Sequence, residues 1–403
     1  MKNKPLILII SYMIIINISA FLVSLNEITI IDHEKVLLIL SLISLPYIIY
    51  NFIKKKITFD KIDKILLIIF TGLIISFIFS LNQDISLWGR NNRGEGLVAI
   101  ISYYIIYYLS RLIPNKKPVI ITFIIIGLVQ SFIGYSQVCL LNESGLKTAK
   151  GVFGNQNFYS TFMILELALV ISIYLFKKSK KAIHLILIFT VSLLIADTSS
   201  GLLAFALILF ISLIVGLKNL DKKFIMRYIT VLALIITSLF IVSFTTRVNP
   251  TKEITKNIND TKKVISEKKL DDSYGTNRIY IWKNTIKKLP TYMWTGSGID
   301  TFNLIYNDKL RIDDGDYHAV VDKTHSEYLQ ILITEGIITF TAYLLFLICI
   351  IKQKREIKSL EFIILLTIIA YLIQAIFNIR VTRVAPYFFI LLGLISTKEL
   401  KHD

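Results

Sequence analysis

The sequence predicts an all-α polytopic membrane protein with about twelve transmembrane helices and one large extracytoplasmic loop that carries an amphipathic helix. Hydrophobic residues make up 54% of the 403 residues, and the mean hydropathy of +0.65 is far above that of soluble domains. One crossing takes about 20 apolar residues, so this content must be divided among many spans. The apolar runs are continuous rather than alternating, which favours helices over a β-barrel.

Twelve apolar runs follow one another along the chain. They cover residues 5–25, 36–53, 62–81, 96–113, 118–140, 157–176, 182–196, 201–217, 224–244, 328–351, 361–379 and 385–397. The first run lacks a small-residue cleavage site and is too long for a signal peptide, so we expect it to stay as a span. The predicted divisions are helices one to nine (1–244), the large loop (245–327), and helices ten to twelve with a short tail (328–403).

Lysine and arginine residues predict that both termini are cytoplasmic and that the large loop lies outside the cell membrane. With the N-terminus inside, the cytoplasmic ends and loops hold 23 basic residues, whereas the short outer loops hold seven. Long translocated loops escape this rule, so the basic residues of 245–327 do not contradict it. The net charge of +17 therefore reflects topology, and no nucleic-acid partner is implied.

An amphipathic helix is predicted within the large loop over residues 276–289. Ile279, Trp282, Ile286 and Leu289 recur at helical spacing, and Pro290 is expected to end the helix. A helix with one apolar face, outside the spans, is expected to lie on or near the membrane surface.

His325 is the strongest candidate for a catalytic residue. Thr324 and Glu327 have the spacing of a capping box, so we expect His325 in the first turn of the tenth span. The positive end of the helix dipole would keep the imidazole neutral, as a general base near pH 7 requires. The alternative interpretation is an interfacial histidine that only helps to cap the helix. His318, also in the large loop, is a competing candidate base.

Arginines of the outer loops are candidates to bind an anionic substrate. They are Arg90, Arg93, Arg278, Arg380 and Arg383. Lysine is abundant elsewhere in this chain, and the planar guanidinium fork suits phosphate better than an ammonium group does. The alternative for each arginine is contact with lipid headgroups at the membrane surface.

Three further features lie at or inside the predicted spans. Asn155 and Asn157, with neighbouring glycines, precede the sixth span and can offer amide donors to a phosphate or sugar, although a loop with a helix cap explains them equally. Glu166 and Glu335 fall within spans, where a carboxylate is costly. Each is either functional or the structural partner of a buried polar group.

Four short segments resemble the superfamily of O-antigen ligases and O-antigen polymerases of the bacterial envelope. They are residues 88–97 (WGRNNRGEGL), residues 151–158 (GVFGNQNF), the stretch from Arg278 through Trp282 and Pro290 to Gly296–Phe302, and His325–Leu329 followed by Glu335-Gly336. Their order and loop placement match over residues 88–390, about three quarters of the chain.

This resemblance implies a glycosyltransferase of cell-surface polysaccharide biosynthesis. It would move a glycan from undecaprenyl pyrophosphate to an acceptor hydroxyl of a glycan, lipid or wall polymer on the outer face, with inversion and without a metal or other cofactor. By the same resemblance, His325 deprotonates the acceptor and Arg278 contacts the pyrophosphate. Arg90 and Arg93 match the arginine-bearing outer loop.

The chain departs from the family pattern at one position, and a second function is also open. Many members carry Ser-Arg-Gly at the start of the eighth span, whereas this chain has Ser199-Ser200-Gly201, so Arg380 or Arg383 is a candidate to replace the missing arginine. The alternative function is export or flipping of a lipid-linked glycan, which predicts an aqueous cavity lined by charges from many spans. Charge-poor spans and polar residues gathered on the outer face favour the enzyme.

Overall fold

Helices dominate the fold. The computed structural model describes residues 3–24, 33–54, 59–90, 93–139, 148–218, 222–246, 248–249, 255, 258–259, 262–263, 266, 277–306, 309–311, 318–353 and 355–396. Each predicted apolar run lies on a helix. These helices are α1 (Lys4–Ser24), α2 (His33–Ile53), α3 (Lys61–Ile78), α5 (Leu97–Arg111), α6 (Lys117–Cys139), α7 (Gln156–Lys177), α8 (Ala182–Ala196), α9 (Ser199–Lys218), α10 (Lys222–Thr245), α14 (Glu327–Ile351), α15 (Leu360–Ala375) and α16 (Ala385–Ile395).

Several of these helices have the length and composition of membrane spans. Among the described residues, seven helices qualify, namely α1, α2, α6, α7, α9, α10 and α14. The apolar helices α5, α8, α15 and α16 are shorter than a full crossing of about 20 residues. The prediction of a helical membrane protein is thus confirmed, whereas the number of twelve crossings stays a prediction.

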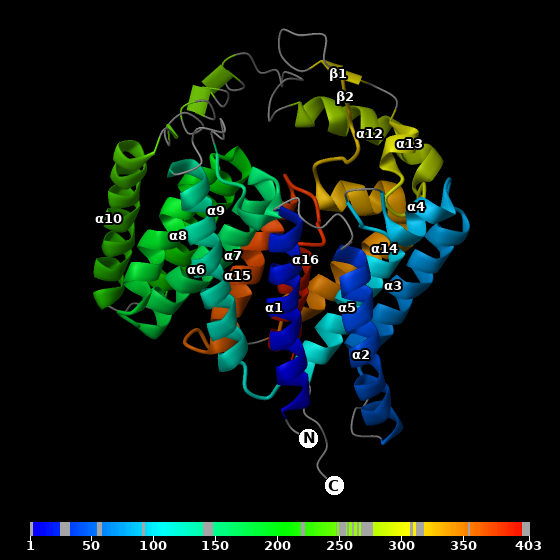
Figure 1. Ribbon diagram of the computed structural model, residues 1–403, viewed down its shortest axis with the longest axis horizontal. Helices are drawn as coiled ribbons and strands as arrows, with labels where there is room; N and C mark the ends of the chain where they lie inside the picture. The colour runs from blue at the N-terminus through cyan, green and yellow to red at the C-terminus, as the bar shows by residue number, and fades with distance from the viewer. Residues whose placement is uncertain are drawn as a thin grey trace.

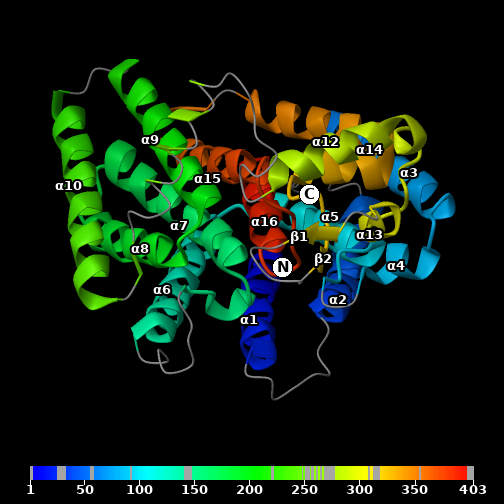
Figure 2. The ribbon, with the colours of Figure 1, turned by 90° about the horizontal axis from the view of Figure 1, so that it is seen from above.

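The helices form one bundle in which α7 holds a central position. Figures 1 and 2 both place α10 at one flank of the bundle and α3 at the other, with α7 and α16 between them. Of the seven candidate spans, α7 is the most buried and α10 the least. The outward-facing isoleucines and phenylalanines of α10 are exposed, which is what a lipid-facing helix requires.

Short elements gather at the end of the bundle opposite the start of α1 (Figure 1). In chain order they are α4 (Gln83–Trp88), α12 (Arg278–Tyr292), α13 (Phe302–Ile305), β1 (Lys309–Arg311) and β2 (His318–Val320). One more short element, the 3-10 helix η2 (Gly151–Phe153), precedes α7 along the chain. Figure 1 shows α12, α13 and the two strands together at this end. The strands pair in antiparallel fashion, with Lys309 opposite Val320.

The predicted amphipathic helix exists as α12, but its buried face differs from the expected one. Ile281 is buried in a small separate core with residues of α13 and the start of α14, and Trp282 packs against that core. Ile286 is exposed. Pro290 lies inside α12 rather than ending it. The expectation failed because the helix packs on its neighbours in the loop, which the spacing of apolar residues alone does not reveal.

A break in α14 joins this loop region to the bundle. Gly336 has φ of +83°, so α14 is interrupted there and nearby backbone groups lose their helical partners. The backbone N–H groups of Ser297 and Gly298 donate to the carbonyls of Ile333 and Thr334 at 3.0 and 3.1 Å. The N–H of Ile337 donates to Met293 at 2.7 Å. The segment after α12 is therefore built into α14 and is not an independent unit.

Candidate active site

A pocket of about 480 Å³ lies between segments that are far apart in the sequence. It is lined by Arg90, Arg93, Phe153, Gly154, Asn155, Phe158, Asp322, Val381, Thr382 and Arg383. Four of the residues predicted to bind substrate, Arg90, Arg93, Asn155 and Arg383, therefore meet at one place. Three guanidinium groups facing one pocket give it the charge that attracts an anionic ligand.

A tight loop between α4 and α5 presents the first two arginines. Gly89 and Gly94 have φ of +91° and +63°, and a side chain on Gly89 would collide with the backbone of Gly94 and Glu95. A residue from a distant segment also holds this loop in place, because the backbone N–H of Arg90 donates to a carboxylate oxygen of Asp300 at 2.8 Å. The glycines of this segment are therefore required by the close turn that aims the arginines.

The N-terminus of α7 supplies another positive group. Asn155 is its N-cap and accepts a hydrogen bond from the N–H of Asn157 at 2.8 Å. Gly154, with φ of +73°, lets Arg383 approach, and a Cβ atom there would lie 3.0 Å from the guanidinium. Arg383 donates to the carbonyl of Val152 at 3.0 Å. Asn157 does not line the pocket, so of the two asparagines only Asn155 borders it.

His325 lies immediately before α14, and the expected capping box is wrong. The helix begins at Glu327 with Ser326 as its N-cap. The Thr324 hydroxyl accepts from the N–H of Ser326 and donates to the Ser326 carbonyl at 2.7 Å. The carboxylate of Glu327 accepts from two buried tyrosine hydroxyls, so it points into the bundle and not back toward the cap. His325 itself has a left-handed φ of +54°.

Charged groups from three segments of the chain act on His325. Burial lowers the pKa of its imidazole to about 4, and Arg278 of α12 acts in the same direction, as does Arg93 more weakly. Asp322 opposes these effects. The ring is therefore neutral at pH 7, as expected, but the cause is burial and arginine charge rather than the helix dipole. His318 stands in β2, and its side chain lies outside the described part of the structure.

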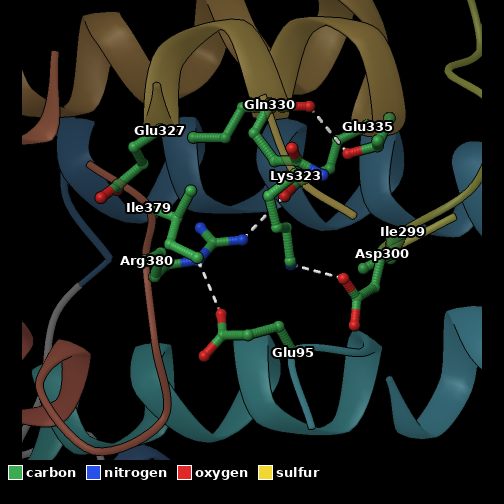
Figure 3. A pocket seen from close by; sticks show the side chains of 11 residues that line it. Glu95, Ile299, Asp300, Lys323, Glu327, Gln330, Glu335, Ile379 and Arg380 are labelled. Atoms are coloured by element: carbon green, nitrogen blue, oxygen red, sulfur yellow. Dashed lines mark hydrogen bonds and ion pairs between the residues drawn. The ribbon is translucent and has the colours of Figure 1, made fainter. Parts of the chain in front are cut away.

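Arg380 does not line the large pocket but belongs to a buried ionic network (Figure 3). Its guanidinium lies 2.7 Å from a carboxylate oxygen of Glu335 and 3.3 Å from one of Glu95. Lys323 and Asp300 form an adjacent buried ion pair. Glu335 is thus a structural partner of Arg380, and of the two arginines proposed to replace the missing family arginine, only Arg383 borders the pocket.

Sequence reasoning missed Asp322. One of its carboxylate oxygens lies 2.7 Å from Nε of Arg93 and 3.7 Å from Nη1 of Arg90. Its position three residues before His325 is the one sequence feature that could have suggested a role for Asp322 in the site. The partners in the buried network, Glu95 and Asp300, stood inside two of the segments quoted above, but their role depends on contacts across the fold.

Glu166 lies apart from the pocket, in the middle of α7. It is fully buried against Gly127 of α6, where a Cβ atom on the glycine would lie 2.6 Å from the carboxylate carbon. Within the described part of the chain neither carboxylate oxygen has a hydrogen-bond partner. The structure therefore gives no pairing that accounts for this residue.

These features define a class of protein, a helical membrane protein with an arginine-lined pocket and a neutral histidine. The histidine does not line the pocket, but two of the pocket's charged residues, Arg93 and Asp322, act on it. Residues 184–344 match the family model described as O-antigen ligase, about two fifths of the chain. The match confirms the predicted resemblance of this part of the chain to the O-antigen ligase and polymerase-like superfamily. The matched region contains Arg278 and His325, whereas Arg90, Arg93 and Arg383 lie outside it. No curated protein matches the chain.

Proposed function

We propose that this protein is a glycosyltransferase that moves a glycan from undecaprenyl pyrophosphate to an acceptor hydroxyl on the outer face of the cell membrane. The observation that carries the proposal is the meeting of Arg90, Arg93 and Arg383 in one pocket. His325 does not line this pocket, but the charges of two pocket residues, Arg93 and Asp322, act on its imidazole. The superfamily contains ligases and polymerases of the glycosyltransferase type, and the pocket supplies what such a reaction needs from the protein.

The leaving group sets the first requirement. When the glycosidic bond to the carrier breaks, the bonding electrons leave with the pyrophosphate, whose negative charge grows in the transition state. Fixed cationic donors aimed at that charge lower the barrier, and guanidinium groups bind phosphate oxygens in a bidentate manner. The N-terminus of α7, capped by Asn155, adds the positive end of a 22-residue helix.

The acceptor sets the second requirement. Its hydroxyl oxygen forms the new bond to the anomeric carbon, and the hydroxyl proton passes to an unprotonated nitrogen of His325. Attack opposite the departing pyrophosphate inverts the configuration at that carbon. Arg278, the first residue of α12, lies within electrostatic reach of His325. We assign it to the pyrophosphate side of the reacting carbon.

The arrangement of the bundle supports the proposed sidedness. Strand β2 lies at the end of the molecule opposite the start of α1 (Figure 1), and the pocket residue Asp322 comes two residues after it in the chain. If the N-terminus is cytoplasmic, the pocket faces outward, where a translocated carrier-linked glycan is presented. The polyprenyl tail of the donor then stays in the bilayer beside the bundle.

Turnover of a purified donor tests this proposal. The full chain in lipid nanodiscs is given an undecaprenyl-pyrophosphate-linked glycan and an acceptor, and release of undecaprenyl pyrophosphate is measured. We expect His325→Ala to lower the rate by at least about a hundredfold, the lower range for loss of a general base. His184→Ala, which changes an exposed histidine of α8, is the matched control. Full activity of His325→Ala would overturn the catalytic assignment.

The same preparation separates the enzyme from an exporter. In sealed vesicles an exporter would carry the intact lipid-linked glycan across the bilayer without releasing the carrier. Transport without cleavage would contradict the proposed function, whereas cleavage that requires an acceptor supports it.

A further inference from the structure

Asp322 is an unexpected residue for an anion-binding pocket. Among the described residues that line the pocket, it is the only one with a carboxylate, and its side chain is 17% exposed. It lies 2.7 Å from Arg93 and 3.7 Å from Arg90, so it occupies the groups that would otherwise receive phosphate oxygens. A negative charge at this place repels an anionic ligand, so its presence needs a reason.

The ionisation of Asp322 is maintained by its surroundings. Burial alone favours the neutral acid, but the hydrogen bond and charge of Arg93, with Lys323 and Arg90, hold the pKa of Asp322 below its usual range. The carboxylate is therefore charged at neutral pH. It offsets one of the three positive charges of the pocket and holds two guanidinium groups in place.

We propose that Asp322 is an internal counter-ion for Arg90 and Arg93, and that the pyrophosphate of the donor replaces it at these arginines. This inference rests on the proposed function, because it takes the ligand of the arginines to be a pyrophosphate. The exchange is balanced in charge, since one anionic oxygen takes the place of another, and no covalent bond changes. The arginines then stay paired and oriented whether or not the donor is bound.

The exchange has a second effect, on His325. The charged groups that act on His325 are Arg278 from α12, Arg93 from the loop before α5, and Asp322 from its own segment. A bound pyrophosphate offsets the two arginines, and Asp322, released from Arg93, keeps its negative charge near the imidazole. Both changes favour the imidazolium and therefore raise the pKa of His325 from about 4. A stronger base is thus present only when the donor is bound.

Binding of inorganic pyrophosphate to the full chain in detergent tests the first part, with titration calorimetry as the readout. Asp322→Asn keeps the shape of the side chain and removes its charge. We expect it to bind pyrophosphate at least about tenfold more tightly than the natural protein, since a charged hydrogen-bond partner no longer competes. Asp322→Glu, which keeps the charge, should bind within about threefold of the natural protein.

Asp84→Asn is the matched control, because Asp84 is an exposed acid in the first turn of α4, close in sequence to Arg90. It removes the same charge without touching the pocket, and we expect unchanged pyrophosphate binding. Equal or weaker binding by Asp322→Asn would overturn the counter-ion, because a residue that merely supports the arginines would weaken binding when changed.

The pH dependence of turnover tests the link to His325. In Asp322→Asn we expect the acid-side limb of the kcat profile to move to lower pH and the plateau to fall, because the base has lost a negative neighbour. General structural damage would lower kcat at every pH without moving the limb, and that result would overturn the link. Pyrophosphate binding that persists in Arg93→Ala would also overturn the exchange. Failure of the proposed function shows elsewhere, as transfer that persists in His325→Ala.

Discussion

Replacing Arg380 by glutamine tests whether this residue holds the fold together or binds the donor. Its side chain is 10% exposed, and the side chains of its two partners, Glu95 and Glu335, are 3% exposed. Removing one member of such a buried cluster leaves the others without compensation, at a cost of about 3–5 kcal/mol in the free energy of unfolding. We expect Arg380→Gln to lose stability of that size.

The loss should depend on pH in a defined direction. Burial raises the pKa of the Glu95 carboxyl, and Arg380 acts against that shift. Without the guanidinium the pKa of Glu95 in the folded protein rises further above its value in the unfolded chain. Such a carboxyl reduces stability as pH rises through its folded pKa, so the deficit of Arg380→Gln should be larger at pH 8 than at pH 5.

Unfolding in detergent, followed by circular dichroism against denaturant at both pH values, measures this deficit. The Tm of the variant in the same detergent is a second readout. A variant that unfolds like the natural protein at pH 5 and at pH 8 would refute the reasoning. If its donor KM were raised at the same time, Arg380 would belong to the substrate site instead.

Two further predictions concern the pocket and the break in α14. Arg383→Gln should raise the donor KM by roughly tenfold to a hundredfold, which corresponds to the loss of about 1.5–3 kcal/mol for a hydrogen bond to a charged group. Its loss of stability should be far smaller than that of Arg380→Gln. Measuring the transfer rate against donor concentration checks this, and an unchanged KM would remove Arg383 from the site. Gly336→Ala places a Cβ atom 2.6 Å from the Trp294 carbonyl at a φ of +83°, so we expect a loss of at least about 1–3 kcal/mol, measured by unfolding in detergent. If Gly336→Ala were as stable as the natural protein, α14 would tolerate an alanine at its interruption and the reasoning about the left-handed φ would be wrong.

The sequence predicted the helical membrane class and the positions of the long helices because apolar runs and membrane thickness leave few alternatives. It also predicted that arginines of the outer loops bind an anionic substrate, and the structure brings three of them, Arg90, Arg93 and Arg383, to one pocket. It could not tell Arg380 from Arg383, which are three residues apart. One lies in a buried network and the other borders the pocket, and that difference depends on whether the facing residue is Glu335 or Gly154.

Other outcomes also depended on contacts between distant segments. Arg111, the last residue of α5, is buried and lies 2.7 Å from Asp63 near the start of α3, although the sequence around it gives no sign of this partner. The capping box failed because the two side chains that defined it have other partners in the fold. A pattern within one segment cannot reveal a partner that is supplied by another helix.

The spread of the pocket along the chain has a consequence for synthesis in the cell. The residues that line it run from Arg90 to Arg383, so its last members are made only after α15 is complete. A nascent chain that has inserted its earlier helices lacks Arg383 and cannot close the site. If the pocket binds the donor as proposed, a partly made copy cannot use it, and an interrupted chain yields an inert membrane protein.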